Sequence, residues 1–197
     1  NWPQLQARGA DVRDDALPPA RGAQAVVSGS CSVATNAQVL HFKQSGRPSL
    51  AIDPLAIAAG EDVAAQALAW AEPLLASGPV LFYATAEPSA VRAVQEKLGV
   101  ARAGEMVEHT LSRIAAGLVQ RGVRQLLVAG GETSGAVVQA LGVQRMAIGP
   151  QIDPGVPWTS VDTPLCPGEQ VHVALKSGKF GSTDFFTKAF AQLSSMP

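Results

Sequence analysis

Apolar and polar residues along the chain follow a pattern that predicts strands and helices in alternation. Short apolar runs between glycine, proline or polar residues predict buried strands at 25–27, 49–52, 80–83, 125–129 and 171–175. Longer segments between them predict helices at 32–44, 61–76, 88–98, 106–120, 133–141 and 184–193. Strands that alternate with helices in this way are typical of βαβ units. The pattern therefore predicts an α/β fold with a mainly parallel sheet and helices on both faces, a Rossmann-like arrangement of three layers.

Two stretches depart from this alternation. Residues 1–22 are polar, with paired aspartates and paired prolines, and predict a linker or mobile arm. Residues 23–197 are then expected to form one domain. Within that domain, prolines and glycines crowd residues 145–170, which predicts a loop-rich stretch.

Composition and charge narrow the class of protein. The chain has 197 residues, of which 47% are hydrophobic and 16% charged, and this predicts a sizeable buried core rather than disorder. The formal net charge is −1 and no cluster of lysine and arginine forms a basic stripe, so nucleic-acid binding lacks its usual electrostatic signature. No apolar run of about 18 residues predicts a membrane span, and no signal peptide is recognisable.

The cysteines and the first residue bear on the protein's setting. Cys31 and Cys166 lack the spacing of a metal site, so no protein metal ligands are predicted. Two thiols in a chain of this size fit a reducing compartment, and we expect a cytoplasmic protein. The chain begins at Asn1 rather than at a methionine, and we expect a fragment or trimmed form of a longer protein.

Three polar turns that contain glycine each follow a predicted strand and precede a predicted helix. They span residues 28–32, 130–135 and 176–182. In a parallel sheet all three lie at the edge where open α/β sheets bind ligands. Each turn offers free N–H groups and the positive end of a helix dipole, and glycine lets an anion approach the backbone. One such turn often reflects backbone geometry alone, but three on one edge favour a ligand that carries phosphate.

Several side chains in these turns have two readings. Thr133 is either the N-cap of the helix that follows or a hydroxyl offered to a phosphate. Glu132 either stabilises the helix N-terminus or holds Mg2+ through water. Lys176 and Lys179 are either point charges for phosphate or solvated lysines.

Two standard nucleotide motifs are absent from the sequence. There is no GxxxxGK[ST] loop and no GxGxxG after the first strand. Asp53 does lie about 20 residues beyond the first turn, where an acid that binds a ribose would stand. This keeps a dinucleotide-dependent oxidoreductase domain as an alternative, although a turn or cap residue before Pro54 is the simpler role for Asp53.

Four segments, in order, resemble the C-terminal domain of the four-carbon acid sugar kinases. They are 27–32 (VSGSCS), 128–135 (VAGGETSG), 149–158 (GPQIDPGVPW) and 175–181 (LKSGKFG). Each segment alone is weak evidence, but four of them in this order are specific to the family. The resemblance covers about residues 23–193. Members of this family are two-domain enzymes that use ATP to phosphorylate acids such as 3-oxo-tetronates or erythronate.

The resemblance implies that this chain is the nucleotide-binding half of such a kinase, with ATP and Mg2+ as cofactors. Its partners would be the nucleotide and an N-terminal sugar-binding domain of the same protein. A homodimer remains open, and a non-catalytic, effector-like interaction module remains an alternative. The segment 149–158 would shape the adenine side, shape the domain interface or form a rigid loop. The ATP contacts implied are Ser30, Gly130, Gly131, Glu132, Thr133 and Gly178, with Ser28 and Gly181 in second rank, and the catalytic base is not indicated.

Overall fold

A seven-stranded sheet runs through the part of the chain that the computed structural model describes, residues 17–195. The strands lie in the order β2-β3-β1-β4-β7-β6-β5. Five neighbours are parallel, namely β2 (Ser49–Ala51), β3 (Val80–Tyr83), β1 (Ala23–Ser28), β4 (Val123–Ala129) and β7 (Val171–Lys176). The last two, β6 (Val156–Asp162) and β5 (Arg145–Asp153), are antiparallel to their neighbours. The predicted α/β fold with a mainly parallel sheet is confirmed.

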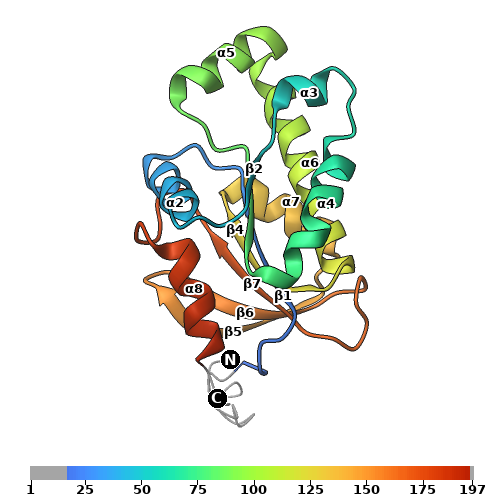
Figure 1. Ribbon diagram of the computed structural model, residues 1–197, viewed down its shortest axis with the longest axis vertical. Helices are drawn as coiled ribbons and strands as arrows, with labels where there is room; N and C mark the ends of the chain where they lie inside the picture. The colour runs from blue at the N-terminus through green and yellow to red at the C-terminus, as the bar shows by residue number, and fades with distance from the viewer. Residues whose placement is uncertain (1–16, 196–197) are drawn as a thin grey trace, which may run out of the picture.

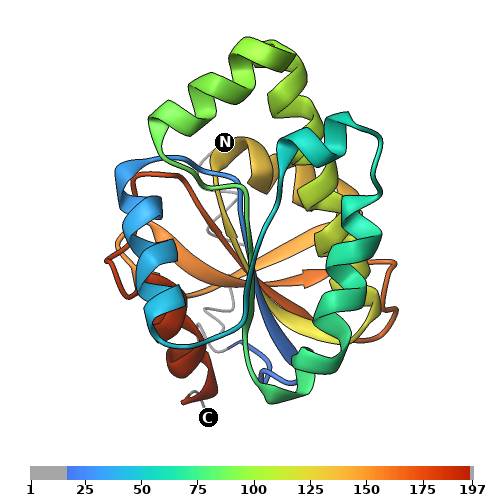
Figure 2. The same cartoon turned by 45° about the horizontal axis from the view of Figure 1, so that its top comes forward.

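Helices cover both faces of this sheet, as predicted (Figures 1 and 2). On one face lie α2 (Val33–Gln44) and α8 (Phe185–Ser194), which bury aromatic residues such as Phe42 and Phe185 against the strands. On the other face lie α4 (Val63–Ala71), α6 (Val100–Gln120) and α7 (Gly131–Leu141), which bury residues such as Leu111 and Leu118. The short helix α3 (Pro54–Ala58), the 3-10 helix η1 (Glu72–Ser77) and α5 (Pro88–Leu98) complete the connections.

The central strands are mostly apolar, and both of their faces are covered by helices. In β4, Leu126 and Val128 belong to the core under α6 and α7, whereas Leu127 and Ala129 belong to the core under α2 and α8. A strand buried on both sides has no polar face to alternate with the apolar one. The apolar run at 126–129 therefore supports the strand predicted at 125–129, and the structure confirms that strand as part of β4.

The loop-rich prediction for 145–170 is wrong over its first part. Residues 145–162 form the hairpin of β5 and β6, which turns at Pro154 and Gly155. Prolines occur here because β5 is the outermost strand and its pairing with β6 is irregular near Gln151; an edge strand tolerates residues that cannot donate to a ladder. The segment 149–158 is thus part of a sheet edge.

Two further differences concern the helices. The sequence pattern predicts a helix from 106, but α6 begins at Val100, so its first turns carry residues that the prediction left in a loop. The five-residue helix α3 was not predicted. No helix of residues 17–195 is both long and apolar enough to cross a membrane.

The chain enters the domain along the outer strand β5. Leu17 is buried, and its side chain fills the place that a Cβ at Gly149 would need. Most of the predicted linker or mobile arm, residues 1–16, lies outside the described residues.

Candidate functional site

The three glycine-containing turns lie side by side at one edge of the sheet. Strands β1, β4 and β7 are parallel neighbours, so their carboxyl ends meet. Backbone hydrogen bonds join the turns: the Gly29 N–H donates to the Ala129 carbonyl (2.9 Å), and the Gly130 N–H donates to the Lys176 carbonyl (2.9 Å). The prediction that these turns share an edge is confirmed. From β1 the strand order runs to β3 and β2 on one side and to β4 and β7 on the other, and such a switch point is the usual position of a ligand crevice.

A cavity of about 610 Å³ opens beside the first two turns. One wall is polar and made largely of backbone, with Ser30 from the first turn and the start of α7 from the second. The opposite wall is apolar and comes from α5 and α6. The lining includes Gly29, Ser30, Cys31, Thr85, Ala90, Val91, Val94, Val107, Glu108, Gly130, Gly131, Glu132 and Thr133. A volume of this size suits a ligand with an apolar part and a polar part.

Glycines at this edge have two different roles. A Cβ at Gly130 would lie 2.9 Å from Thr133 Oγ1 and 3.2 Å from the Ser30 nitrogen, and the backbone there has a φ of +127°. A Cβ at Gly29 would overlap the same Thr133 hydroxyl. These two glycines let the turns approach each other. Gly131 is different, because a Cβ there would meet nothing within 4 Å and would point into open space.

The N-terminus of α7 faces the cavity without a side-chain cap. Gly130 is the N-cap residue, and no side chain caps the helix. The Ser134 N–H donates to the Gly130 carbonyl (2.9 Å), which is the first hydrogen bond of the helix. The N–H groups of Gly131, Glu132 and Thr133 are therefore free of helical partners and carry the positive end of the helix dipole. The N-cap reading of Thr133 is wrong, since Thr133 lies within the first turn and packs its hydroxyl against Gly29 and Gly130.

Two carboxylates line the cavity next to these N–H groups. Glu108 on α6 lies within hydrogen-bonding reach of Glu132 on α7. Burial, and after it the neighbouring Glu132, raise the pKa of Glu108. A pair of like charges at this spacing favours a shared proton or a cation. Residues 17–195 contain no cluster of three or more histidine, cysteine, aspartate or glutamate side chains suited to a metal.

Ser28 lies beneath the cavity. It is fully buried, and its hydroxyl shares a hydrogen bond of 2.7 Å with Thr85 Oγ1. Thr85 follows β3 and lines the cavity. Ser28 therefore joins the ends of β1 and β3, and it reaches the cavity only through Thr85.

The third turn is fixed by side chains of α2 and β7. Ser32 is the N-cap of α2 and accepts from the Thr35 N–H (3.2 Å). The Gly178 carbonyl accepts from Ser32 Oγ, from Thr35 Oγ1 (3.1 Å) and from Lys176 Nζ (3.4 Å). A Cβ at Gly178 would lie 2.5 Å from Ser30 Oγ. Gly178 thus touches the first turn at Ser30, although it does not line the cavity itself.

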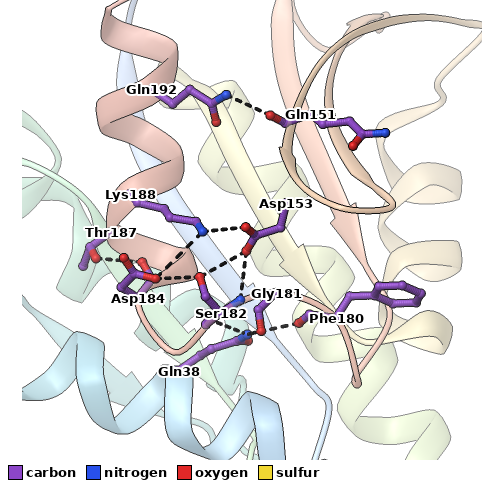
Figure 3. Close-up of polar contacts among 10 residues, drawn as sticks. All are labelled: Gln38, Gln151, Asp153, Phe180, Gly181, Ser182, Asp184, Thr187, Lys188 and Gln192. Carbon is purple, nitrogen blue, oxygen red and sulfur yellow. Dashed lines mark hydrogen bonds and ion pairs between the residues drawn. The ribbon is translucent and has the colours of Figure 1, made fainter.

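Gly181 lies farther away, within a network that braces the turn (Figure 3). Gln38 Nε2 donates to the carbonyls of Phe180, Gly181 and Ser182 at 3.0–3.1 Å. Asp153 accepts from the Ser182 N–H (2.8 Å) and from Lys188 Nζ (2.5 Å). Gly181 has a φ of +85° and packs on Phe185. Its position indicates a structural role in this turn.

The charges of this network stabilise the ionised form of Asp153. Burial by itself would raise the pKa of Asp153. The hydrogen bonds from Lys188 and Ser182 outweigh this effect, so the pKa lies below its usual value. The end of β5 is thereby tied to the start of α8, and the third turn is held between them.

Asp53 does not face the cavity. Its side chain accepts from the Leu55 N–H (2.8 Å) and caps α3, which confirms the simpler of its two roles. The cavity at this point is lined instead by Ala51, Ile52 and Pro54.

The apolar wall of the cavity was missed from the sequence. It is formed by α5, through Ala90, Val91 and Val94, and by the first turns of α6. The connection after β3 contains no glycine, so it lacks the sequence signal that marks the other turns at this edge. This connection lies beside the first turn because β3 pairs with β1, and the sequence pattern does not specify the order of the strands.

An α/β domain with free N–H groups at the carboxyl ends of its central strands belongs to the class of domains that bind phosphate-bearing ligands. Residues 25–186 match the family model described as the nucleotide-binding C-terminal domain, and the chain belongs to this family. This match and the 3-oxo-tetronate kinases among its relatives together confirm the resemblance to the four-carbon acid sugar kinases.

Curated relatives and solved structures agree with this assignment. The 3-oxo-tetronate kinase of Burkholderia multivorans is 57% identical over 185 residues, which are 92% of this chain and 42% of that protein. A crystal structure of a Haemophilus influenzae protein has a TM-score of 0.81 and 38% identity, covering 96% of this chain and 44% of that one. A Bordetella bronchiseptica protein, solved as a domain-swapped dimer with bound citrate, has a TM-score of 0.66 and 20% identity, covering 88% and 42%. The chain thus spans about two fifths of these proteins.

Proposed function

We propose that this chain is the ATP-binding half of a cytoplasmic kinase that phosphorylates a four-carbon acid sugar such as 3-oxo-tetronate. The observation that carries the proposal is the uncapped N-terminus of α7, which presents three free N–H groups to a cavity with an apolar wall. The kinase relative at 57% identity supports the choice of ATP as the ligand.

The two walls of the cavity suit the two parts of ATP. The N–H groups of Gly131, Glu132 and Thr133, with the hydroxyl of Ser30, would bind phosphate oxygens. The apolar side chains of α5 and α6 would contact the adenine ring. Phosphoryl transfer depends mainly on positioning and on neutralisation of charge, and this half supplies both for the donor.

The acceptor would come from the rest of the protein. The relatives are more than twice as long as this chain, and we expect an N-terminal domain to hold the sugar acid and its hydroxyl. A second copy of the chain is a further partner that the dimeric Bordetella bronchiseptica protein suggests, although its 20% identity extends to the fold alone.

Calorimetry on this chain tests the proposal. ATP and ADP in the presence of Mg2+ are expected to bind with a dissociation constant below about 1 mM, because the cavity lies within the described part of one domain. The absence of heat with either nucleotide at millimolar concentration would contradict the proposal. Binding of NADH in place of ATP would favour an oxidoreductase domain instead.

Mg2+ fits the carboxylate pair at the cavity. Glu132 and Glu108 would hold the ion directly or through water. When bound, Mg2+ would neutralise part of the phosphate charge. Burial first, and then the neighbouring Glu132, raise the pKa of Glu108, and a cation beside the two carboxylates would favour their ionised forms.

The Glu132→Gln substitution is expected to change nucleotide affinity in opposite directions without and with Mg2+. Without Mg2+, removal of a negative charge near the phosphates should tighten ADP binding about fivefold, since one charge pair at this range is worth about 1 kcal/mol. With Mg2+, the loss of a ligand should weaken binding. Calorimetry with ADP in EDTA and in excess Mg2+ measures both, and equal changes in the two conditions would argue against an ion at Glu132.

A further inference from the structure

Lys176 is a buried lysine without a carboxylate partner in residues 17–195. It ends β7, its side chain is 1% exposed, and none of the ion pairs in this part of the chain includes it. A buried ammonium without a counter-charge is costly. Lys179, three residues on in the same turn, is exposed to solvent and has no such cost.

The three donors of Lys176 are all directed at the third turn and at α2. Nζ donates to Thr35 Oγ1 (2.9 Å), to the Ser177 carbonyl (3.1 Å) and to the Gly178 carbonyl (3.4 Å). The lysine therefore holds two successive carbonyls on one side of the backbone. Ser32 and Thr35 strengthen this arrangement at Gly178.

The orientation of these carbonyls fixes the N–H groups that follow them. In a planar trans peptide the N–H points opposite to the carbonyl of the same unit. The N–H groups of Gly178 and Lys179 are therefore turned away from Lys176. Neither donates to an acceptor within the described part of the chain. Successive free N–H groups form the type of concave backbone site that binds anions.

We propose that Lys176 is a positioning residue for the nucleotide phosphate. It orients the N–H groups of Gly178 and Lys179 toward the phosphate, and the bound phosphate supplies the counter-charge that Lys176 lacks among residues 17–195. The inference rests on the proposed function. Lys176 has no donor left for a direct contact with phosphate, so it acts through the turn and through its charge. Gly178 lies against Ser30 Oγ, so the charge of Lys176 is close to the turn at 28–32, which lines the cavity.

The protonation of Lys176 should then depend on the ligand. Burial lowers the pKa of Lys176 to about 8, and burial is its sole cause. The ionisable side chains of the surrounding elements form no ion pair or hydrogen bond with it, namely His41 and Lys43 on α2, Arg124 on β4, Glu132 on α7, His172 on β7, Asp153 on β5, Asp162 on β6, Asp184 and Lys188 by α8, and Lys179 in the turn. A bound phosphate favours the ammonium and raises this pKa. Binding is thus favoured below pH 8 and weakens as the pH rises through 8, where free Lys176 loses its proton.

Calorimetry with ADP and Mg2+ tests this inference on the wild-type chain. We expect the dissociation constant to rise about tenfold from pH 7 to pH 9, as one proton becomes linked to binding. Titrations at pH 8 in buffers of different ionisation enthalpy should show uptake of about half a proton per nucleotide, because half of the free chains lack this proton. The nucleotide phosphates are ionised in this range and contribute little.

Two matched variants assign the proton. Lys176→Met removes the charge while keeping an apolar stem, and it should bind ADP about tenfold more weakly at pH 7, with no dependence on pH up to 9. Lys179→Met removes the exposed lysine of the same turn and should keep the proton uptake. If Lys176→Met does not fold, the wild-type titration still decides. Binding that is independent of pH and takes up no proton overturns this inference alone, whereas no binding at any pH overturns the proposed function and this inference with it.

Discussion

The Gly131→Val variant is expected to fold as the wild-type chain does and to lose at least about 100-fold in affinity for ATP and ADP. A side chain at this position meets no protein atom within 4 Å, so the fold has room for it. It would occupy the space in front of the free N–H groups of α7 and keep a phosphate from them. Loss of two hydrogen bonds to a charged ligand, at about 1.5 kcal/mol each, accounts for this factor.

Gly135→Val is the matched control for this prediction. Gly135 lies one turn further along α7, a Cβ there also meets nothing within 4 Å, and the residue does not line the cavity. Both variants replace a helical glycine by valine, so their effects on helix propensity are alike. Calorimetry should find normal affinity for Gly135→Val and circular dichroism should find both variants folded. Equal affinity in the two variants would place the phosphates elsewhere.

The glycine turns could be predicted from the sequence because their signal is local. A polar turn that contains glycine after an apolar run marks the carboxyl end of a strand, and parallel strands bring such ends to one edge. Ser30, Gly130, Gly131, Glu132 and Thr133 do line one cavity. Whether these residues bind ATP stays a prediction that the calorimetric experiments address.

The rest of the site depends on contacts between distant segments. Glu108 meets Glu132 because α6 packs beside α7. Lys176 is buried next to α2, where Thr35 Oγ1 accepts a hydrogen bond from its Nζ. A lysine in a polar turn has the same sequence signal whether it is solvated or enclosed. Gly178 and Gly181 show the same limit, since two glycines of one turn have separate surroundings, one against Ser30 and one against Phe185.

The hairpin of β5 and β6 could not be predicted from the sequence pattern because it contains three prolines. Pro150, Pro154 and Pro157 read as loop punctuation, but they lie in an outer strand, at a turn and at an irregular pair. Such positions do not need the missing N–H. The apolar residues among and just after these prolines, Trp158 above all, are the signal that indicates a buried strand.

The Trp158→Ala variant is therefore expected to lower the free energy of unfolding by about 3–5 kcal/mol, the cost of emptying a large aromatic site in a core. Trp158 is fully buried under α8, where its indole N–H donates to the Ala189 carbonyl (3.1 Å) and its ring packs near Phe190 at 6.0 Å between centroids. Because α8 also carries Lys188, which pairs with Asp153 beside the third turn, we expect nucleotide affinity to fall as well.

Urea unfolding of Trp158→Ala and Trp158→Phe separates the two contributions of this side chain. Phenylalanine keeps much of the volume and loses the hydrogen bond, and should cost about 1 kcal/mol. Were residues 145–170 a solvated loop, as the distribution of proline and glycine suggests, alanine at this position would change stability by about 0.5 kcal/mol or less. The difference between the alanine and phenylalanine variants therefore measures how far the hairpin belongs to the core, and a small value for both would contradict its burial under α8.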